Sequence, residues 1–259
     1  MPLIETKVEG FVGTICLDHF EKRNALSAAL VEEILAALDS FEKARVRAVV
    51  LRARPGVRIW SAGHDVEELP GVHRDPLGWQ DPLRRLIRGI ENSGAPVIAM
   101  IEGGVFGGAF ETAMACDIVV AANNAIFALT PARLGVAYNV AGMLTFLNSA
   151  PLRIIKEMAF TARPIPAERA LAAGLVNHVV PPEKLEATAY AIAAEIVENA
   201  PLSIAVMKEE LRILAGAHPL SPQGWERVQG LRRIVYDSAD YVEGLKAFKE
   251  KRKPVYKGE

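Results

Sequence analysis

A glycine-rich turn is the stretch of this sequence that is best suited to chemistry, with four glycines in six residues at positions 103, 104, 107 and 108. The apolar run 97–101 before it predicts a buried strand, and the compact apolar segment 109–115 after it predicts a buried helix. Glycine lets the backbone approach a ligand closely. The first amides of a helix also have no intrahelical acceptor. The turn therefore predicts a site for an anion, or for an oxyanion that forms only in a transition state.

Two alternatives compete for the same glycines. A phosphate-binding loop is disfavoured because no Gly-Lys-Ser/Thr follows and the spacing is GGxxGG instead of GxGxxG. Tight packing of a strand against a helix is the second alternative, and the glycines alone do not decide between packing and a site.

A second turn with similar potential reads SAGHD at 61–65 and comes soon after a buried strand expected at 48–51. If neighbouring strands bring both turns side by side, two backbone N–H groups can converge on one oxygen. That geometry suits a thioester carbonyl that becomes an enolate. Loss of one such donor typically costs about 3–4 kcal/mol of transition-state stabilisation.

The elements that must position these turns alternate between strands and helices. A strand pair is expected at 3–8 and 11–17, then a helix capped by Ser27, and later a helix that buries Leu83, Leu86 and Ile90. A surface loop is expected at 70–82 and a further strand at 117–121. From about residue 140 the pattern predicts helices only. The fold class is therefore α/β with a helical C-terminal part.

Several motifs resemble those of the crotonase, or enoyl-CoA hydratase/isomerase, superfamily. They are SAGHD at 61–65, EGGVFGGAFE at 102–111, TPARLGV at 130–136 and FKEKRKP at 248–254, and they occur in the same order from end to end. The resemblance implies a spiral of ββα units at 1–195, which holds the CoA and active site. It implies a C-terminal helical region at 196–259 for trimerisation and closure over CoA. The expected assembly is a homo-oligomer, either a trimer or a dimer of trimers.

The resemblance also implies acyl-CoA substrates whose thioester oxygen is held by the backbone amides of His64 and Gly108. Hydratases of this superfamily use two glutamates. The first is present as Glu111, whereas the second position holds Ala132. Because addition of water to a double bond needs an acid–base pair, ordinary hydratase activity is disfavoured.

Within the superfamily, SAGHD, GVAYN at 135–139 and the segment 236–254 most resemble members that decarboxylate methylmalonyl-CoA. The expected reaction converts methylmalonyl-CoA, or a close malonyl-CoA analogue, to propionyl-CoA and CO₂ through an enolate. Tyr138 and the His64 ring are candidates to orient the carboxylate. An apolar pocket favours loss of CO₂, and its candidate lining is Val105, Phe106, Val136 and Ala137. The alternatives are an enoyl-CoA hydratase or isomerase with Glu111 as sole acid/base, and a non-catalytic CoA- or RNA-binding protein.

The remaining contacts to the coenzyme also come from the resemblance. Lys22 and Arg23 are expected near the phosphates, and Thr130 along the acyl or pantetheine path. The other candidates are Ala62, Asp65 and Val66 near adenine, Gly63 in the turn, and Phe248 and Lys251 over the nucleotide. No biotin, metal or other cofactor is expected, since coenzyme A is part of the substrate.

The composition indicates which classes of partner and which cellular location to expect. The chain has 30 basic and 31 acidic residues among 259, a net charge of −1, so a nucleic-acid partner is not expected. Two cysteines in apolar surroundings indicate reduced thiols. No apolar run approaches the ~18 residues of a membrane span, and no secretion signal is visible, so a cytoplasmic protein without membrane contact is expected.

Overall fold

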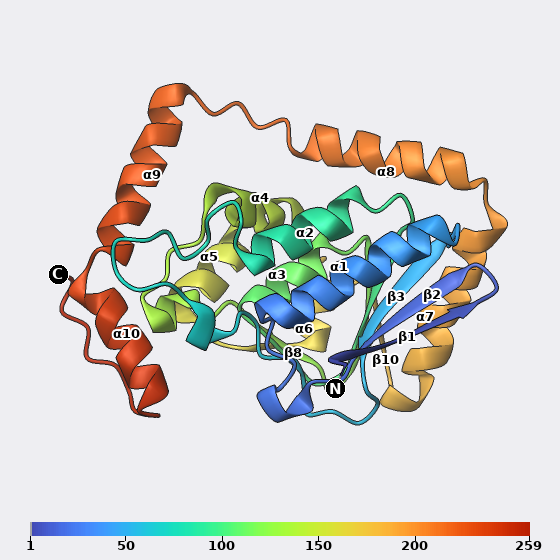
Figure 1. Cartoon of the computed structure of the whole chain (residues 1–259), viewed down its shortest axis with the longest axis horizontal. Helices are drawn as coiled ribbons and strands as arrows, with labels where there is room; N and C mark the ends of the chain where they lie inside the picture. The colour runs from blue at the N-terminus through green and yellow to red at the C-terminus, as the bar shows by residue number, and fades with distance from the viewer. Residues whose placement is uncertain (1) are drawn as a thin grey trace.

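The structure, a computed structural model, describes residues 2–259 and contains two sheets with helices around them (Figure 1). The large sheet has six strands in the order β1-β2-β3-β5-β7-β10, and the small sheet has four in the order β4-β6-β8-β9. The large-sheet strands are β1 (Ile4–Glu9), β2 (Val12–Leu17), β3 (Ala48–Ala53), β5 (Val97–Ile101), β7 (Ile118–Ala122) and β10 (His178–Val180). The small-sheet strands are β4 (Ile59–Ser61), β6 (Gly104–Phe106), β8 (Ile126–Ala128) and β9 (Ile165–Pro166).

The chain repeats a strand–strand–helix unit in which the first strand joins the large sheet and the second joins the small one. The repeats are β3-β4 followed by helix α2 (Pro82–Asn92), and β5-β6 followed by α3 (Gly108–Ala115). β7 and β8 follow the same rule before the 3₁₀ helix η3 (Pro131–Leu134) and α4 (Val140–Ser149). This arrangement confirms the expected spiral of ββα units.

Alternation along the strands explains why both faces of the large sheet are covered. Val50, Ile98 and Val120 pack against α7 (Pro182–Glu198), whereas Val49 and Leu51 belong to the main core together with α1 (Ala28–Lys43), α2 and α3. Strands buried on both faces read as continuous apolar runs. The Ser27 side chain accepts the Leu30 amide, which confirms the expected cap of α1.

Beyond residue 140 the expectation of helices only is wrong in two places. α5 (Leu152–Thr161) and α6 (Ala167–Ala172) are separated by β9, and β10 precedes α7. β9 has two residues, one of them Pro166, and β10 has three, none of them buried. Such short segments carry no recognisable alternation of apolar and polar residues.

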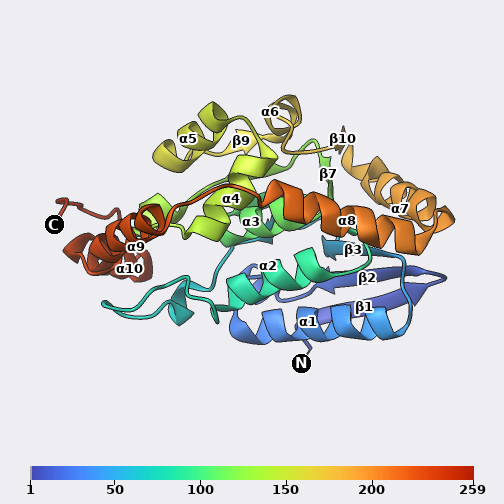
Figure 2. The same ribbon diagram turned by 90° about the horizontal axis from the view of Figure 1, so that it is seen from above.

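The C-terminal helices form an arm around the core (Figures 1 and 2). They are α8 (Pro201–Ala215), α9 (Pro222–Tyr236) and α10 (Ala239–Lys249). The expected boundary at 195/196 lies inside α7, which continues to Glu198 and packs on the sheet. The division into a core and an oligomerisation region stays a prediction.

No single helix among residues 2–259 is both long enough and apolar enough to cross a membrane. Only α7 and α8 together reach the required length and apolar content, and they are bent by 109° relative to each other.

Candidate active site

The two glycine-containing turns lie side by side because β4 and β6 are parallel neighbours in the small sheet. The turn 61–65 follows β4, and the turn into α3 follows β6. A Cβ atom placed on Gly108 would lie 3.1 Å from the His64 amide nitrogen, and one placed on Gly63 would lie 2.9 Å from the Gly108 nitrogen. The juxtaposition expected from the sequence is therefore present in the structure.

Backbone geometry leaves both amides without a partner in their own elements. Leu26 forms a parallel bridge with His64: the Leu26 amide donates to the Gly63 carbonyl at 2.8 Å, and the Asp65 amide donates to the Leu26 carbonyl at 3.5 Å. The N–H of His64 itself therefore points to the opposite side of this bridge. Gly108 is the first residue of α3, where amides have no acceptor within the helix. Gly107 before it has φ 53° and ψ −118°, a conformation that glycine adopts readily.

The His64 ring is held at both nitrogens. Nε2 lies 2.7 Å from Oδ2 of Asp81, and Nδ1 lies 3.0 Å from the Asp65 carbonyl oxygen. Burial lowers the pKa of His64, but hydrogen bonds and charge from Asp81 outweigh it, so the pKa is raised overall. The ring is thus engaged by protein groups, which favours the backbone amide of His64 over its side chain as the group that meets a ligand.

Tyr138 and Glu111 both pack around Gly142 of α4. A Cβ atom on Gly142 would lie 2.7 Å from Tyr138 Cδ1 and 2.9 Å from Glu111 Oε1. The Tyr138 ring packs edge-on against Phe146 with centroids 5.3 Å apart, which fixes its direction. Burial, and then the charge of Glu111, raise the pKa of Tyr138. The hydroxyl therefore stays protonated and able to donate.

Glu111 is fully buried and forms an ion pair with Arg84 of α2. Burial raises the pKa of Glu111 to about 7, although Arg84 acts in the opposite direction. Its second oxygen, Oε2, is buried without a hydrogen-bond partner among residues 2–259. A carboxylate that is sealed in this way is poorly placed to exchange protons with a substrate.

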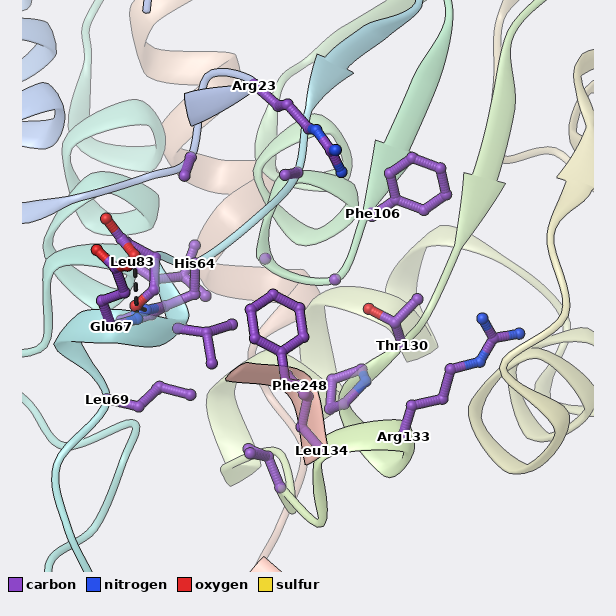
Figure 3. A pocket seen from close by; sticks show the side chains of 18 of the residues that line it. Arg23, His64, Glu67, Leu69, Leu83, Phe106, Thr130, Arg133, Leu134 and Phe248 are labelled. Atoms are coloured by element: carbon purple, nitrogen blue, oxygen red, sulfur yellow. Dashed lines mark hydrogen bonds between the residues drawn. The ribbon is translucent and has the colours of Figure 1, made fainter. Parts of the chain in front are cut away.

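A cavity of about 650 Å³ opens beside the two turns. Figure 3 shows Phe248 of α10 between His64 and Leu83 on one side and Thr130 on the other. The expected site residues on its wall are Lys22, Arg23, Ala62, His64, Asp65, Val66, Phe106, Gly108, Thr130, Val136, Tyr138 and Phe248. Gly63, Val105, Glu111, Ala137 and Lys251 do not line this cavity in the described chain.

The wall beside Lys22 is already occupied by ion pairs. The Lys22 ammonium lies 2.8 Å from Glu67 and 3.1 Å from Asp65. Hydrogen bonds to Glu67 and Asp65 raise the pKa of Lys22. Arg23 has left-handed backbone, with φ 55°, and its side chain reaches toward Phe106 (Figure 3). The cavity therefore joins an end lined by charged side chains of both signs to the apolar surface near Tyr138.

The family is decided by a match over almost the whole chain, since the model for enoyl-CoA hydratase/isomerase matches residues 7–259. The chain belongs to the enoyl-CoA hydratase/isomerase family. Methylmalonyl-CoA decarboxylase of Escherichia coli (strain K12) is 47% identical over 247 residues, 95% of each chain. Carnitinyl-CoA dehydratase of the same strain is 35% identical over 256 residues, 96% of each chain.

Solved structures of the same family agree with these relatives. A methylmalonyl-CoA decarboxylase in complex with 2-nitronate-propionyl-CoA is 46% identical with a TM-score of 0.98, covering 99% of each chain. A methylmalonyl-CoA decarboxylase complexed with 2S-carboxypropyl-CoA is 46% identical with a TM-score of 0.97, covering 99% of this chain and 98% of the other. The resemblance stated from the sequence motifs is confirmed.

Sequence reasoning missed several residues at the site of this enoyl-CoA hydratase/isomerase family member. Leu83 and Arg133 line the cavity, Asp81 binds the His64 ring, and Arg84 binds Glu111. Asp81-Pro82 at the start of an amphipathic helix signals a helix cap. That signal says nothing about a partner 17 residues earlier in the chain.

Among residues 2–259, no group of three or more His, Cys, Asp or Glu side chains is arranged as a metal site.

Proposed function

We propose that this protein decarboxylates methylmalonyl-CoA, or a close malonyl-CoA analogue, to propionyl-CoA and CO₂. The observation that supports the proposal is that the amide nitrogens of His64 and Gly108 lie close together on the wall of a cavity that Tyr138 also lines. Curated and solved relatives named methylmalonyl-CoA decarboxylase, 46–47% identical over nearly the full chain, support it.

The thioester carbonyl serves as the electron acceptor of this reaction. The bond from Cα to the carboxylate breaks, CO₂ leaves, and the electron pair enters the thioester as an enolate. The oxyanion accepts hydrogen bonds from the amides of His64 and Gly108, which point at the place where the charge develops. A solvent proton then adds to Cα and restores the neutral thioester. Coenzyme A belongs to the substrate, and the proposed reaction uses neither biotin nor a metal.

Tyr138 has the role of orienting the carboxylate. The C–C bond breaks most easily when it lies perpendicular to the thioester plane, because its electrons then overlap with the carbonyl π system. The Tyr138 hydroxyl donates to the carboxylate and holds it there, while Val136 and Phe106 supply apolar surface that favours neutral CO₂.

Contacts to coenzyme A are proposed along the rest of the cavity. Lys22 and Arg23 are assigned to the phosphates, where a point charge suits phosphate oxygens. Thr130 is assigned to the acyl and pantetheine path. Ala62, Gly63, Asp65 and Val66 form the adenine side, and Phe248 with Lys251 closes over the nucleotide.

Hydration or isomerisation of enoyl-CoA with Glu111 as sole acid/base is the competing activity. The buried pairing of Glu111 with Arg84 argues against it, as does Ala132 at the second glutamate position of the superfamily. We also infer a homo-oligomer, a trimer or dimer of trimers, and a cytoplasmic location in view of the free thiols of Cys16 and Cys116.

The deciding experiment compares substrates on the purified protein without added metal, biotin or nucleotide. Methylmalonyl-CoA is expected to yield propionyl-CoA and CO₂, identified by mass, while crotonyl-CoA is hydrated weakly or not at all. Efficient hydration of crotonyl-CoA without CO₂ release from methylmalonyl-CoA would falsify the proposal.

Tyr138→Phe tests the orienting hydroxyl, because it keeps the ring packed on Phe146. Loss of one such hydrogen bond to a charged group costs about 1–3 kcal/mol, a decrease in kcat/KM of about 5- to 150-fold. An unchanged kcat/KM would remove Tyr138 from the proposed mechanism.

A further inference from the structure

One carboxylate, that of Asp81, connects the two halves of the oxyanion hole. Asp81 caps α2: its Oδ1 accepts the Leu83 amide at 3.0 Å, while Oδ2 lies 2.7 Å from His64 Nε2. The Leu83 side chain lies on the other half, with Cδ2 2.9 Å from the position of a Cβ atom on Gly108. The side chains of His64 and Asp81 are only 10% and 9% exposed.

The contacts of the His64 ring define its protonation. The Asp65 carbonyl can only accept, so Nδ1 carries a proton. The Asp81 oxygen 2.7 Å from Nε2 holds the other nitrogen, and although burial lowers the pKa of His64, the hydrogen bond and charge of Asp81 raise it overall.

Other charges surround the ring without replacing Asp81. Glu68 lies close enough to raise the pKa of His64, whereas Asp65 and Glu67 are both paired with the Lys22 ammonium. Asp81 is the carboxylate in direct contact with the ring.

Holding both ring nitrogens restricts rotation of residue 64 about its own backbone. Donors of an oxyanion hole stabilise charge only when they are aligned before the reaction, so the orientation of one peptide plane matters for rate. We propose that Asp81 is a positioning residue that clamps the His64 ring and thereby aims the His64 amide at the thioester oxygen. This inference rests on the proposed function, because it assigns that amide to the enolate.

Two substitutions separate clamping from helix capping. Asp81→Ser keeps a cap for α2 but is too short to reach the ring, whereas Asp81→Asn keeps the cap and can donate to a neutral ring. For Asp81→Ser we expect kcat to fall about 10-fold or more, with KM changed less than about threefold, as for a lost transition-state interaction. The kcat of Asp81→Asn is expected to be at least about threefold higher than that of Asp81→Ser. Full kcat in Asp81→Ser would overturn the proposal.

A double-mutant cycle tests whether Asp81 acts through His64. His64→Ala removes the clamped ring and is expected to lower kcat, and adding Asp81→Ser to it should cause less than about a twofold further loss, because coupled residues are not additive. Losses that multiply would show that Asp81 acts by another route and would overturn the clamp.

A measurement without turnover separates this inference from the proposed function. The infrared band of propionyl-CoA labelled with ¹³C at the thioester carbonyl should shift to lower frequency on binding, and shift less in Asp81→Ser. A wild-type protein that releases no CO₂ but shows this difference would contradict the proposed function and support the clamp. Decarboxylation with equal shifts in both proteins would overturn the clamp alone.

Discussion

Residue 108 combines two requirements that only glycine meets. In the proposed mechanism its amide faces the thioester oxygen, and the place where a side chain would start lies 3.1 Å from the His64 amide nitrogen. Contacts of 3.0–3.4 Å are tighter than most real Cβ contacts, so any side chain there crowds the second donor. The same backbone position thus supplies one hydrogen bond and leaves room for the other.

Gly108→Pro removes the N–H at the first residue of α3, and its ring also crowds the His64 amide nitrogen and the Leu83 side chain. We expect kcat/KM to fall by about 10²–10³-fold, as for other losses of an oxyanion-hole donor. His64→Ala retains its amide and should lose less. Steady-state kinetics measures which variant loses more kcat/KM, and circular dichroism checks that both variants are folded. Activity retained in a folded Gly108→Pro but abolished in His64→Ala would mean that side chains carry the reaction.

Arg84 and Glu111 make a buried pair whose effect on stability depends on pH. Burial raises the pKa of Glu111 in the folded protein to about 7, above its ordinary 4.5. A raised pKa means that the protonated form stabilises the fold. This contribution is complete below pH 4.5 and is lost as pH rises toward about 7.

Arg84→Met removes the charge that lowers the pKa of Glu111, so the folded pKa rises further. The free energy of unfolding of this variant should therefore keep falling above pH 7, by up to about 1.4 kcal/mol per pH unit, where the wild-type contribution of Glu111 has levelled off. Urea denaturation at pH 6.5, 7.5 and 8.5 measures this. Arg84→Met/Glu111→Gln is the control, since it lacks the titrating group. Identical slopes in wild type and Arg84→Met would contradict the coupling.

At the scale of elements, α10 holds the wall of the cavity. Gly244 packs so closely on η3 that a Cβ atom there would lie 2.3 Å from the Leu134 carbonyl oxygen. The Tyr241 hydroxyl donates to the Pro70 carbonyl at 2.7 Å and so joins the helix to the loop before α2. Phe248, near the end of the same helix, reaches into the cavity (Figure 3).

Gly244→Ala should push α10 away from η3, because the clash is with backbone. If Phe248 closes over the coenzyme, KM for acyl-CoA rises by about fivefold, for the loss of about 1 kcal/mol of apolar contact. Gly230→Ala in α9 is a matched control, since a Cβ there has open space and alanine favours a helix by about 1 kcal/mol. Equal KM values in both variants would remove α10 from the binding site.

The sequence predicted elements well where burial is continuous and motifs are local. The strands around β5, the cap at Ser27 and the pairing of the two turns all depend on apolar runs or glycine spacing. The contacts of Asp81 with His64 and of Arg84 with Glu111 could not be predicted from the sequence, because the folded structure alone brings α2 against the two turns. The sequence likewise does not indicate that Glu111 would be buried in an ion pair with Arg84.

At the scale of the whole molecule, the arm formed by α8 and α9 lacks a core of its own. None of the residues of α8 is buried within the described chain, although Lys208 anchors it to Asp117 at 2.7 Å. Leu211 and Leu214 are 68% and 71% exposed, and Ile234 of α9 is 68% exposed. Figures 1 and 2 show α8 running along the outside of the core. Exposed apolar side chains gathered on one helix are typical of association sites.

Leu211→Glu places a charge on this apolar face and should weaken assembly. We propose that the wild-type protein is a trimer or a hexamer at micromolar concentration, because a single copy leaves the leucines of α8 and α9 exposed. Charged residues are depleted from the centre of such interfaces. We therefore expect Leu211→Glu to shift the mass measured by light scattering toward the monomer.

Glu210→Lys, next to it on α8, is the matched control, because it exchanges one exposed charge for another and should leave the mass unchanged. A wild-type monomer at these concentrations would contradict the interface. An unchanged mass in Leu211→Glu would place the interface elsewhere than on α8.

If the oligomer forms through α8 and α9, then Arg232 of α9, whose guanidinium binds Asp75 at 2.8 Å, connects the interface to the loop that ends at Asp81. Loss of assembly in Leu211→Glu should then raise KM for acyl-CoA as well.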